Sequence, residues 1–302
     1  MIRAANAPCS WGVLEFGSEG RAPNPAQVLD EIASTGYVGT ELGDWGFLPT
    51  DPAQLRQALG SRALDLVGAF VPVALPDRSA HQAGEATAVK TARLLAALAT
   101  TSASRPKIVL SDATVANPLR AAKAGRITAA DGLSPSAWQI VAEAAERIAR
   151  AVLTETGLRT VFHHHCATYV ETPSEIAELM ARTSNELLGL CLDTGHATYG
   201  GGDALELLEQ HRARIDHVHF KDCEPRVAAA ARQQQWDYIQ AVRSGVFCEL
   251  GNGSVDFPAI AAALRRTGYD GWIVVEQDVL PSMGSPAESA SRNRSFLRRL
   301  AI

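Results

Sequence analysis

The 302-residue chain lacks an excess of basic residues: 28 Lys and Arg stand against 33 Asp and Glu, giving a formal net charge of −5. Proteins that bind nucleic acid through its phosphates usually carry a basic excess, so we expect no nucleic-acid partner. An anionic membrane surface is an equally poor partner. Long apolar runs are also missing, both within the chain and in the N-terminal MIRAANAPCSWG. We therefore expect no membrane span and no signal peptide.

Cysteine is scarce, and its spacing excludes two common kinds of site. The five residues are Cys9, Cys166, Cys191, Cys223 and Cys248, and no two form a C-x-x-C pair. Zinc-knuckle and thioredoxin-like proteins are therefore not supported. An odd number of scattered cysteines suggests free thiols in a reducing compartment, so we expect a cytoplasmic protein. No G-x-G-x-x-G motif follows the first expected strand, which weakens a dinucleotide-binding interpretation.

The chain does contain short β-type runs that alternate with longer helical patterns. A capping residue followed by proline marks four helix starts, at Asn24-Pro25, Asp51-Pro52, Ser134-Pro135 and Thr172-Pro173. The expected strands are residues 2–7, 39–42, 65–73, 107–112, 160–165, 187–193, 215–222 and 271–278. Eight such units predict an α/β fold, a closed (β/α)8 TIM barrel, with an open doubly wound sheet as the alternative. The length suits a single domain over residues 1–302.

Polar side chains gather where the later strands are expected to end, which is where TIM barrels carry their active sites. They are His163, His165, Asp193, His196, His217, His219, Lys221, Glu276 and Asp278. Alternate residues of a strand share a face, so neighbouring strands would offer His, Asp, His and Glu to one space. Burying these groups unpaired would be costly, and a divalent metal would be a suitable partner. Mixed imidazole and carboxylate ligands favour Mn, Co, Zn or Fe over Mg or Ca.

Further candidates lie at the ends of the earlier strands. Glu41 ends the second expected strand and Asp112 ends the fourth. Trp11 and Trp45 follow the first and second strands, where each could form an aromatic wall against a ligand or anchor a loop.

Two long segments, residues 111–133 and 223–255, follow strands at the same end. Long loops of this kind often close over substrates, although they could simply decorate the rim. Arg243, in the second segment, could bind a substrate oxygen or be an ordinary surface residue. We expect His164 to point outward as a structural residue and Cys191 to be an inert core thiol.

These residues fall in motifs that resemble the xylose-isomerase-like sugar isomerase/epimerase superfamily. The motifs are HHHCATYVET (163–172), LDTGHATYGGGD (192–203), HVHFKD (217–222) and VVEQD (274–278). Three further segments make the chain similar to the inosose dehydratases of inositol catabolism: NAPCSWG (6–12), GYVGTELG (36–43) and AVRSGVFCELGNGSVDF (241–257).

The resemblance implies a TIM barrel with Mn or Co, with Zn, Mg or Fe as alternatives, and a polyol or keto-sugar substrate. It implies metal ligation by Asp193, His219, Glu276 and a fourth residue at the end of strand five, which is His163 or His165. The candidate catalytic residues are Glu276, His163, His196, Lys221 and Glu41. The candidate substrate contacts are His165, His196, Lys221, Trp11 and Arg243. Whether the chain forms a homo-oligomer stays open.

One departure from the superfamily pattern bears on the reaction. Many of these epimerases place a Glu on strand five opposite the Glu of strand eight, whereas His163 occupies the matching position in this chain. That substitution disfavours epimerisation by two carboxylates and leaves room for an elimination, which needs one base and one acid. The sequence therefore predicts a metal-dependent dehydratase of a keto-inositol or related cyclic polyol ketone. The alternative is a metal-dependent sugar isomerase or epimerase. An abasic-site endonuclease, disfavoured by the net charge, and a non-catalytic sugar-binding barrel are weaker alternatives.

Overall fold

Eight parallel strands close into a barrel in the order β1-β10-β7-β6-β5-β4-β3-β2, so the predicted (β/α)8 TIM barrel is confirmed. The structure is a computed structural model and describes residues 1–13, 23–99, 105–114, 116–278, 280 and 283–302. The barrel strands are β1 (Arg3–Asn6), β2 (Gly39–Glu41), β3 (Asp65–Val73), β4 (Lys107–Asp112), β5 (Thr160–His163), β6 (Leu188–Asp193), β7 (Ile215–Phe220) and β10 (Trp272–Val275). Strand β10 closes the ring by pairing along the whole of β1.

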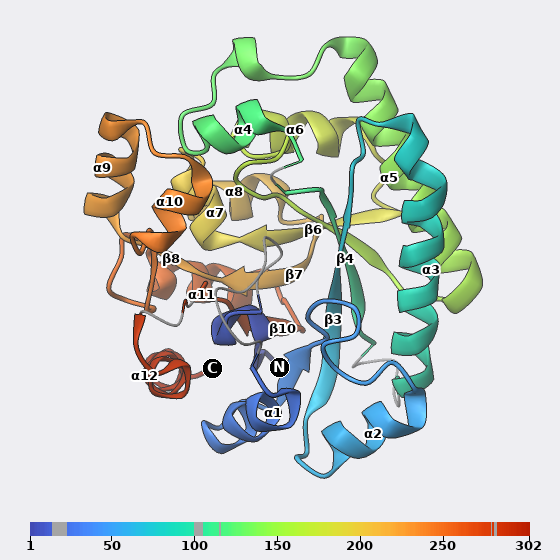
Figure 1. Ribbon diagram of the computed structural model, residues 1–302, viewed down its shortest axis with the longest axis vertical. Helices are drawn as coiled ribbons and strands as arrows, with labels where there is room; N and C mark the ends of the chain where they lie inside the picture. Colours follow the sequence, from blue (N-terminus) through green and yellow to red (C-terminus); the bar gives the residue numbers. More distant parts are fainter. Residues whose placement is uncertain (14–22, 100–104, 115, 279, 281–282) are drawn as a thin grey trace.

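Helices surround this barrel, as Figure 1 shows for α3, α5 and α11. The helices that follow the strands are α1 (Pro25–Ser34), α2 (Pro52–Gly60), α3 (His81–Leu98), α5 (Pro135–Thr156), α6 (Pro173–Arg182), α8 (Ala204–His211), α11 (Phe257–Arg266) and α12 (Pro286–Arg299). The four predicted starts are confirmed, because the side chains of Asn24, Asp51, Ser134 and Thr172 each accept a hydrogen bond from a backbone N–H of the first turn.

Both long segments contain secondary structure. Residues 111–133, apart from residue 115, which lies outside the described ranges, include α4 (Pro118–Lys123) and a 3-10 turn (Ala129–Asp131). Residues 222–256 include β8 (Asp222–Cys223), α9 (Pro225–Gln234), α10 (Tyr238–Arg243) and β9 (Phe247–Cys248). We call residues 222–256 the β7–α11 insertion. Figure 1 shows α4, α9 and α10 on the same side of the barrel.

Three strands near the predicted site residues end two or three residues earlier than the sequence suggested. Strand β5 ends at His163 rather than at residue 165, because the His165 N–H turns back to the Val170 carbonyl at 3.0 Å. Strand β7 ends at Phe220, since Asp222 instead pairs with Cys248 in a separate antiparallel ladder. Strand β10 ends at Val275, and the Gln277 N–H then bonds the Ser10 hydroxyl. The predicted site residues near these ends therefore lie on or just beyond the barrel rim.

The alternation of side chains across the sheet is as expected for strands packed between a barrel interior and outer helices. Phe220 faces outward, with its ring centroid 4.8 Å from that of Phe257 in α11. Cys191 lies in a small buried cluster with Val109 and Val161, consistent with a core thiol. Among the described residues, no helix is both long and apolar enough to cross a membrane.

Candidate metal centre and active site

Four side chains at the carboxyl ends of adjacent strands form a cluster with the composition of a metal site. They are His163 (β5), Asp193 (β6), His219 (β7) and Glu276, which directly follows β10, and their candidate ligand atoms all lie within 4.8 Å of one another. Asp193 Oδ2 is 3.6 Å from His163 Nε2 and 3.8 Å from His219 Nδ1. His219 Nδ1 is 3.3 Å from Glu276 Oε1. We call these four residues the metal cluster.

The metal cluster contains buried polar atoms that lack hydrogen bonds among the described residues and that a bound cation would satisfy. Asp193 Oδ2 and His219 Nδ1 are buried and have no hydrogen-bond partner in the part of the chain that the structure describes. Burial opposes ionisation of Asp193, but the Lys221 ammonium and the His163 ring lower its pKa to about 2. An ionised carboxylate oxygen and a ring nitrogen, both desolvated and aimed at one point, fit a divalent metal. His163 rather than His165 belongs to this cluster.

A second layer of groups fixes the orientation of His219. Glu41 Oε1 lies 3.1 Å from His219 Nε2 and 2.8 Å from His217 Nε2. Burial alone would raise the pKa of Glu41, but the two imidazoles lower it to about 2, so its oxygen accepts from both rings. Because Nε2 faces the Glu41 carboxylate, Nδ1 is the nitrogen that His219 presents to the metal cluster. Carboxylate–histidine pairs of this kind orient metal ligands in many proteins.

A buried lysine joins the metal cluster to a group of polar side chains. Lys221 Nζ lies 3.2 Å from Glu276 Oε2, 3.3 Å from Asp278 Oδ1 and 3.2 Å from His196 Nε2. Burial opposes its charge, but Asp278, Glu276 and Asp193 together raise the pKa of Lys221 well above its usual value. The cavity therefore contains one ammonium donor held between two carboxylates.

His165 and His196 form a stacked pair beside the lysine, with ring centroids 3.8 Å apart. Burial lowers the pKa of both rings well below the usual histidine value, so both are neutral at neutral pH. His165 Nδ1 lies 2.6 Å from the Cys166 carbonyl oxygen, which can only accept a hydrogen bond. The proton of His165 is therefore on Nδ1, and Nε2 faces the Tyr238 hydroxyl at 3.4 Å.

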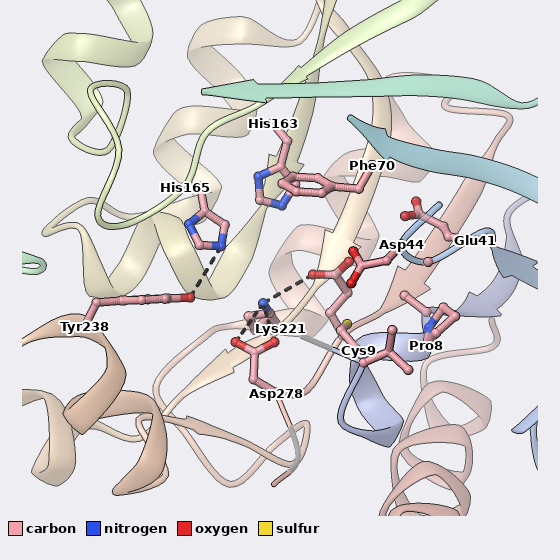
Figure 2. Close-up of a pocket in the computed structure, with 14 residues that line it drawn as sticks. Pro8, Cys9, Glu41, Asp44, Phe70, His163, His165, Lys221, Tyr238 and Asp278 are labelled. Atoms are coloured by element: carbon pink, nitrogen blue, oxygen red, sulfur yellow. Dashed lines mark hydrogen bonds and ion pairs between the residues drawn. The ribbon is translucent and has the colours of Figure 1, made fainter. Parts of the chain in front are cut away.

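These groups border a cavity at the mouth of the barrel with about 580 Å³ of empty space, including open solvent. Figure 2 shows Tyr238 and His165 on one side of it, Phe70 near His163, and Lys221 with Asp278 below. A cavity with several convergent polar groups and two aromatic side chains suits a small polyhydroxylated ring.

The structure brings most of the predicted site residues together. Glu41, His163, His165, Lys221 and Glu276 line the cavity. Asp193, His196 and His219 are buried and contact those lining residues.

Two predicted substrate contacts do not line the cavity. Trp11 is buried in the hydrophobic core, and its indole N–H donates to Glu31 at 2.6 Å. Arg243 is exposed in the last turn of α10. Trp45, which was also considered as an aromatic wall, is 40% exposed and packs against the Lys90 ammonium.

Several cavity residues were given no role in the predictions from the sequence. Asp278 could have been assigned, since it lies two residues beyond Glu276 and contacts the same lysine. Phe70, Asp44 and Tyr238 also line the cavity. Tyr238 had no such signal in the sequence, because it belongs to the β7–α11 insertion. The alternation of residues along a strand predicts which side chains face the barrel interior, but it does not predict where an insertion lies.

The structure is a TIM barrel with four residues suited to metal ligation at the carboxyl ends of its later strands. A family model described as Xylose isomerase-like TIM barrel matches residues 29–300. The chain belongs to this family.

Individual relatives agree with that membership over almost the whole chain. An inosose dehydratase of Geobacillus kaustophilus (strain HTA426) is 34% identical over 301 residues, covering 99% of this chain and 94% of that protein. One from Salmonella typhimurium (strain LT2) is 32% identical, covering 99% and 96%. Among solved structures, the probable 3-DHS dehydratase AsbF from Bacillus anthracis matches with a TM-score of 0.69 at 15% identity, covering 99% of each chain. An L-ribulose 3-epimerase matches with a TM-score of 0.70 at 15% identity, covering 99% and 94%.

Proposed function

We propose that this chain is a metal-dependent hydro-lyase, with one barrel domain over residues 1–302, that dehydrates a keto-inositol (an inosose) or a related cyclic polyol ketone. The observation that carries the proposal is the metal cluster beside the cavity, in which strand β5 contributes His163 and not a second glutamate opposite Glu276. The similarity to inosose dehydratases over nearly the full chain supports the choice of substrate.

The proposed metal is Mn²⁺ or Co²⁺, with Zn²⁺, Mg²⁺ or Fe²⁺ as alternatives, because the donors are two imidazoles and two carboxylates. His163, Asp193, His219 and Glu276 would hold it. When bound, the metal would supply a Lewis acid that stabilises the negative charge developing on the ketone oxygen.

The protein's own residues then account for the proton transfers. Glu276 has the most exposed side chain of the metal cluster, at 12% against 2% or less for the other three. Its Oε1 faces His219 and its Oε2 faces Lys221 and the cavity. We assign Glu276 as the base that removes the proton α to the ketone. The electron pair of that C–H bond forms the new double bond as the β C–O bond breaks.

Lys221 is assigned as the acid that protonates the departing hydroxyl, which leaves as water. Its ammonium lies between Glu276 and Asp278, within 3.4 Å of both. Glu41 is unsuited to this role, because its ionised carboxylate already accepts from His217 and His219. His196 lies behind the cavity wall and its neutral ring positions Lys221.

The test is an assay of metal-stripped protein with scyllo-inosose, with and without added Mn²⁺ or Co²⁺. Formation of the enolisable dione is followed by its ultraviolet absorbance. We expect product only with metal. Absence of product from metal-loaded protein would contradict the proposal. Exchange of the α-hydrogen with solvent, or epimer formation without loss of water, would instead identify an isomerase or epimerase.

A further inference from the structure

The β7–α11 insertion is fixed over the mouth of the barrel by several polar contacts. The Asp222 carboxylate accepts backbone N–H groups of Gly251 and Gly253, at 2.8 and 2.9 Å, which holds the end of the insertion against its start. Arg126 donates to the Trp236 carbonyl at 2.9 Å, and Arg232 donates to the Gly125 carbonyl at 3.0 Å. These bonds tie α9 and the start of α10 to the segment after β4. A side chain that the insertion directs into the cavity is therefore held in place before substrate arrives.

Tyr238 is that side chain. It is the first residue of α10, and the Asp237 carboxylate caps the helix by accepting from the Gln240 N–H at 2.7 Å. The Tyr238 ring packs edge-on against the His165 imidazole, with ring centroids 5.4 Å apart and an interplanar angle of 67°. Only 1% of the residue is exposed, yet it lines the cavity. Figure 2 shows its hydroxyl directed inward and joined to His165.

The side of the cavity formed by Tyr238 and His165 differs chemically from the side that holds the proposed reacting groups. Lys221, Asp278 and Glu276 place full charges on one side. On the other side, the Tyr238 hydroxyl and the His165 ring form a hydroxyl–imidazole pair, in which His165 Nδ1 bonds the Cys166 carbonyl and Nε2 faces the tyrosine. A hydroxyl–imidazole pair suits a substrate hydroxyl, which both donates and accepts. It suits a phosphate or carboxylate poorly.

We propose that Tyr238, supported by His165, is a substrate-binding residue that hydrogen-bonds a hydroxyl of the polyol ring away from the reacting carbons, and so selects for a hydroxyl at that position. This inference rests on the proposed function, because it assumes a cyclic polyol ketone in the cavity. A site built to bond a hydroxyl discriminates against an analogue that lacks it, because its own polar group is then left unpaired.

The experiment compares Tyr238→Phe with Tyr169→Phe in the metal-loaded full chain. Tyr169 carries its hydroxyl on the same end of the barrel but bonds Asn117 outside the cavity lining, so it is the matched control. Binding of myo-inositol, a non-reacting polyol, is measured by calorimetry, and turnover of scyllo-inosose is measured in parallel. We expect Tyr238→Phe to weaken polyol binding and to raise KM by about ten-fold, with kcat changing less and the Mn²⁺ content unchanged. Tyr169→Phe should match the wild type.

A panel of mono-deoxy inososes separates a substrate contact from a structural role, because a purely structural role for Tyr238 would not change discrimination against one particular analogue. For one member of the panel, the wild type should have a kcat/KM about ten-fold lower than for the parent inosose. For that same member, the kcat/KM of Tyr238→Phe should equal its own value for the parent inosose. Equal polyol affinity and equal KM in Tyr238→Phe and the wild type would overturn the inference while leaving the proposed function intact. A wild type that binds the polyol but does not dehydrate inosose would refute only the proposed reaction. The polyol affinities of Tyr238→Phe and the wild type would then test the inference about Tyr238. A wild type that neither binds nor reacts would overturn both.

Discussion

Replacing Glu41 with glutamine tests how the protein orients a metal ligand. In the wild type one carboxylate oxygen accepts from both His217 and His219, at 2.8 and 3.1 Å. Hydrogen bonds to a charged group exceed neutral ones by roughly 1 kcal/mol, so we expect Glu41→Gln to lower the free energy of unfolding by about 2 kcal/mol for the two bonds. The larger effect falls on metal affinity. Without the carboxylate, His219 is free to carry its proton on Nδ1, the atom that faces the metal cluster, and we expect about 10- to 100-fold weaker metal binding.

The assay is competition for Mn²⁺ against a fluorescent chelator, combined with urea unfolding of the metal-free protein. Asp112→Asn is the matched control. Asp112 is also a buried carboxylate at the end of a barrel strand, but it accepts backbone N–H groups from Leu75 and Tyr169, each at 3.1 Å, rather than histidines. We expect this control to lose stability and to keep its metal affinity. If Glu41→Gln loses stability but binds Mn²⁺ within two-fold of the wild type, Glu41 does not orient His219 for the metal.

Three further predictions concern catalysis, stability and pH dependence. Glu276→Gln should lower kcat by at least about 100-fold as judged by dione formation, and near-normal turnover would rule out Glu276 as the base. Arg120→Met should lower the free energy of unfolding in urea by roughly 3–5 kcal/mol, because it leaves the Glu175 carboxylate, bonded through both oxygens at 2.8 Å, buried without its partner; a loss below about 1 kcal/mol would contradict this. Burial raises the pKa of Glu171 from 4.5 to about 7. The contribution of this carboxyl group to stability is therefore complete below about pH 4.5 and is lost as the pH rises through 7, by about 3 kcal/mol. Urea unfolding of Glu171→Gln should show a flatter pH dependence of stability between about pH 4.5 and 7, and a pH dependence equal to that of the wild type would refute the assignment.

Much of the fold could be predicted from the sequence because its signals are local. Asn24, Asp51, Ser134 and Thr172 each precede a proline, and that pair of residues specifies a helix start without help from the rest of the chain. The strand from Asp65 to Val73 was bounded correctly, because its apolar run is flanked by helix stops and turns. The ends of β5, β7 and β10 were placed too late, since hydrogen bonds outside the barrel sheet, with Val170, Cys248 and Ser10, decide them.

In the candidate site, too, residues marked by local sequence signals were predictable and residues placed by tertiary contacts were not. Residues with a period of two at strand ends, such as His217, His219 and Lys221, were predictable because a parallel barrel brings strand ends together. Tyr238 was not, because the position of the β7–α11 insertion depends on contacts with segments more than 100 residues away in the chain, such as the bond from Arg126 to Trp236. The double role of Glu41 as acceptor for two histidines likewise depends on closure of the barrel, which brings side chains of the non-adjacent strands β2 and β7 together in its interior.

The proposed chemistry depends on His163, Asp193, His219 and Glu276 holding one divalent cation, and equilibrium dialysis against Mn²⁺ tests this most directly. The proteins compared are the wild type, His163→Ala and His165→Ala, because His163 belongs to the metal cluster while His165 faces Tyr238. We predict that the wild type and His165→Ala bind about one Mn²⁺ per chain, and that His163→Ala binds it more than about 100-fold more weakly. Mn²⁺ affinity in His163→Ala equal to that of the wild type would contradict the account.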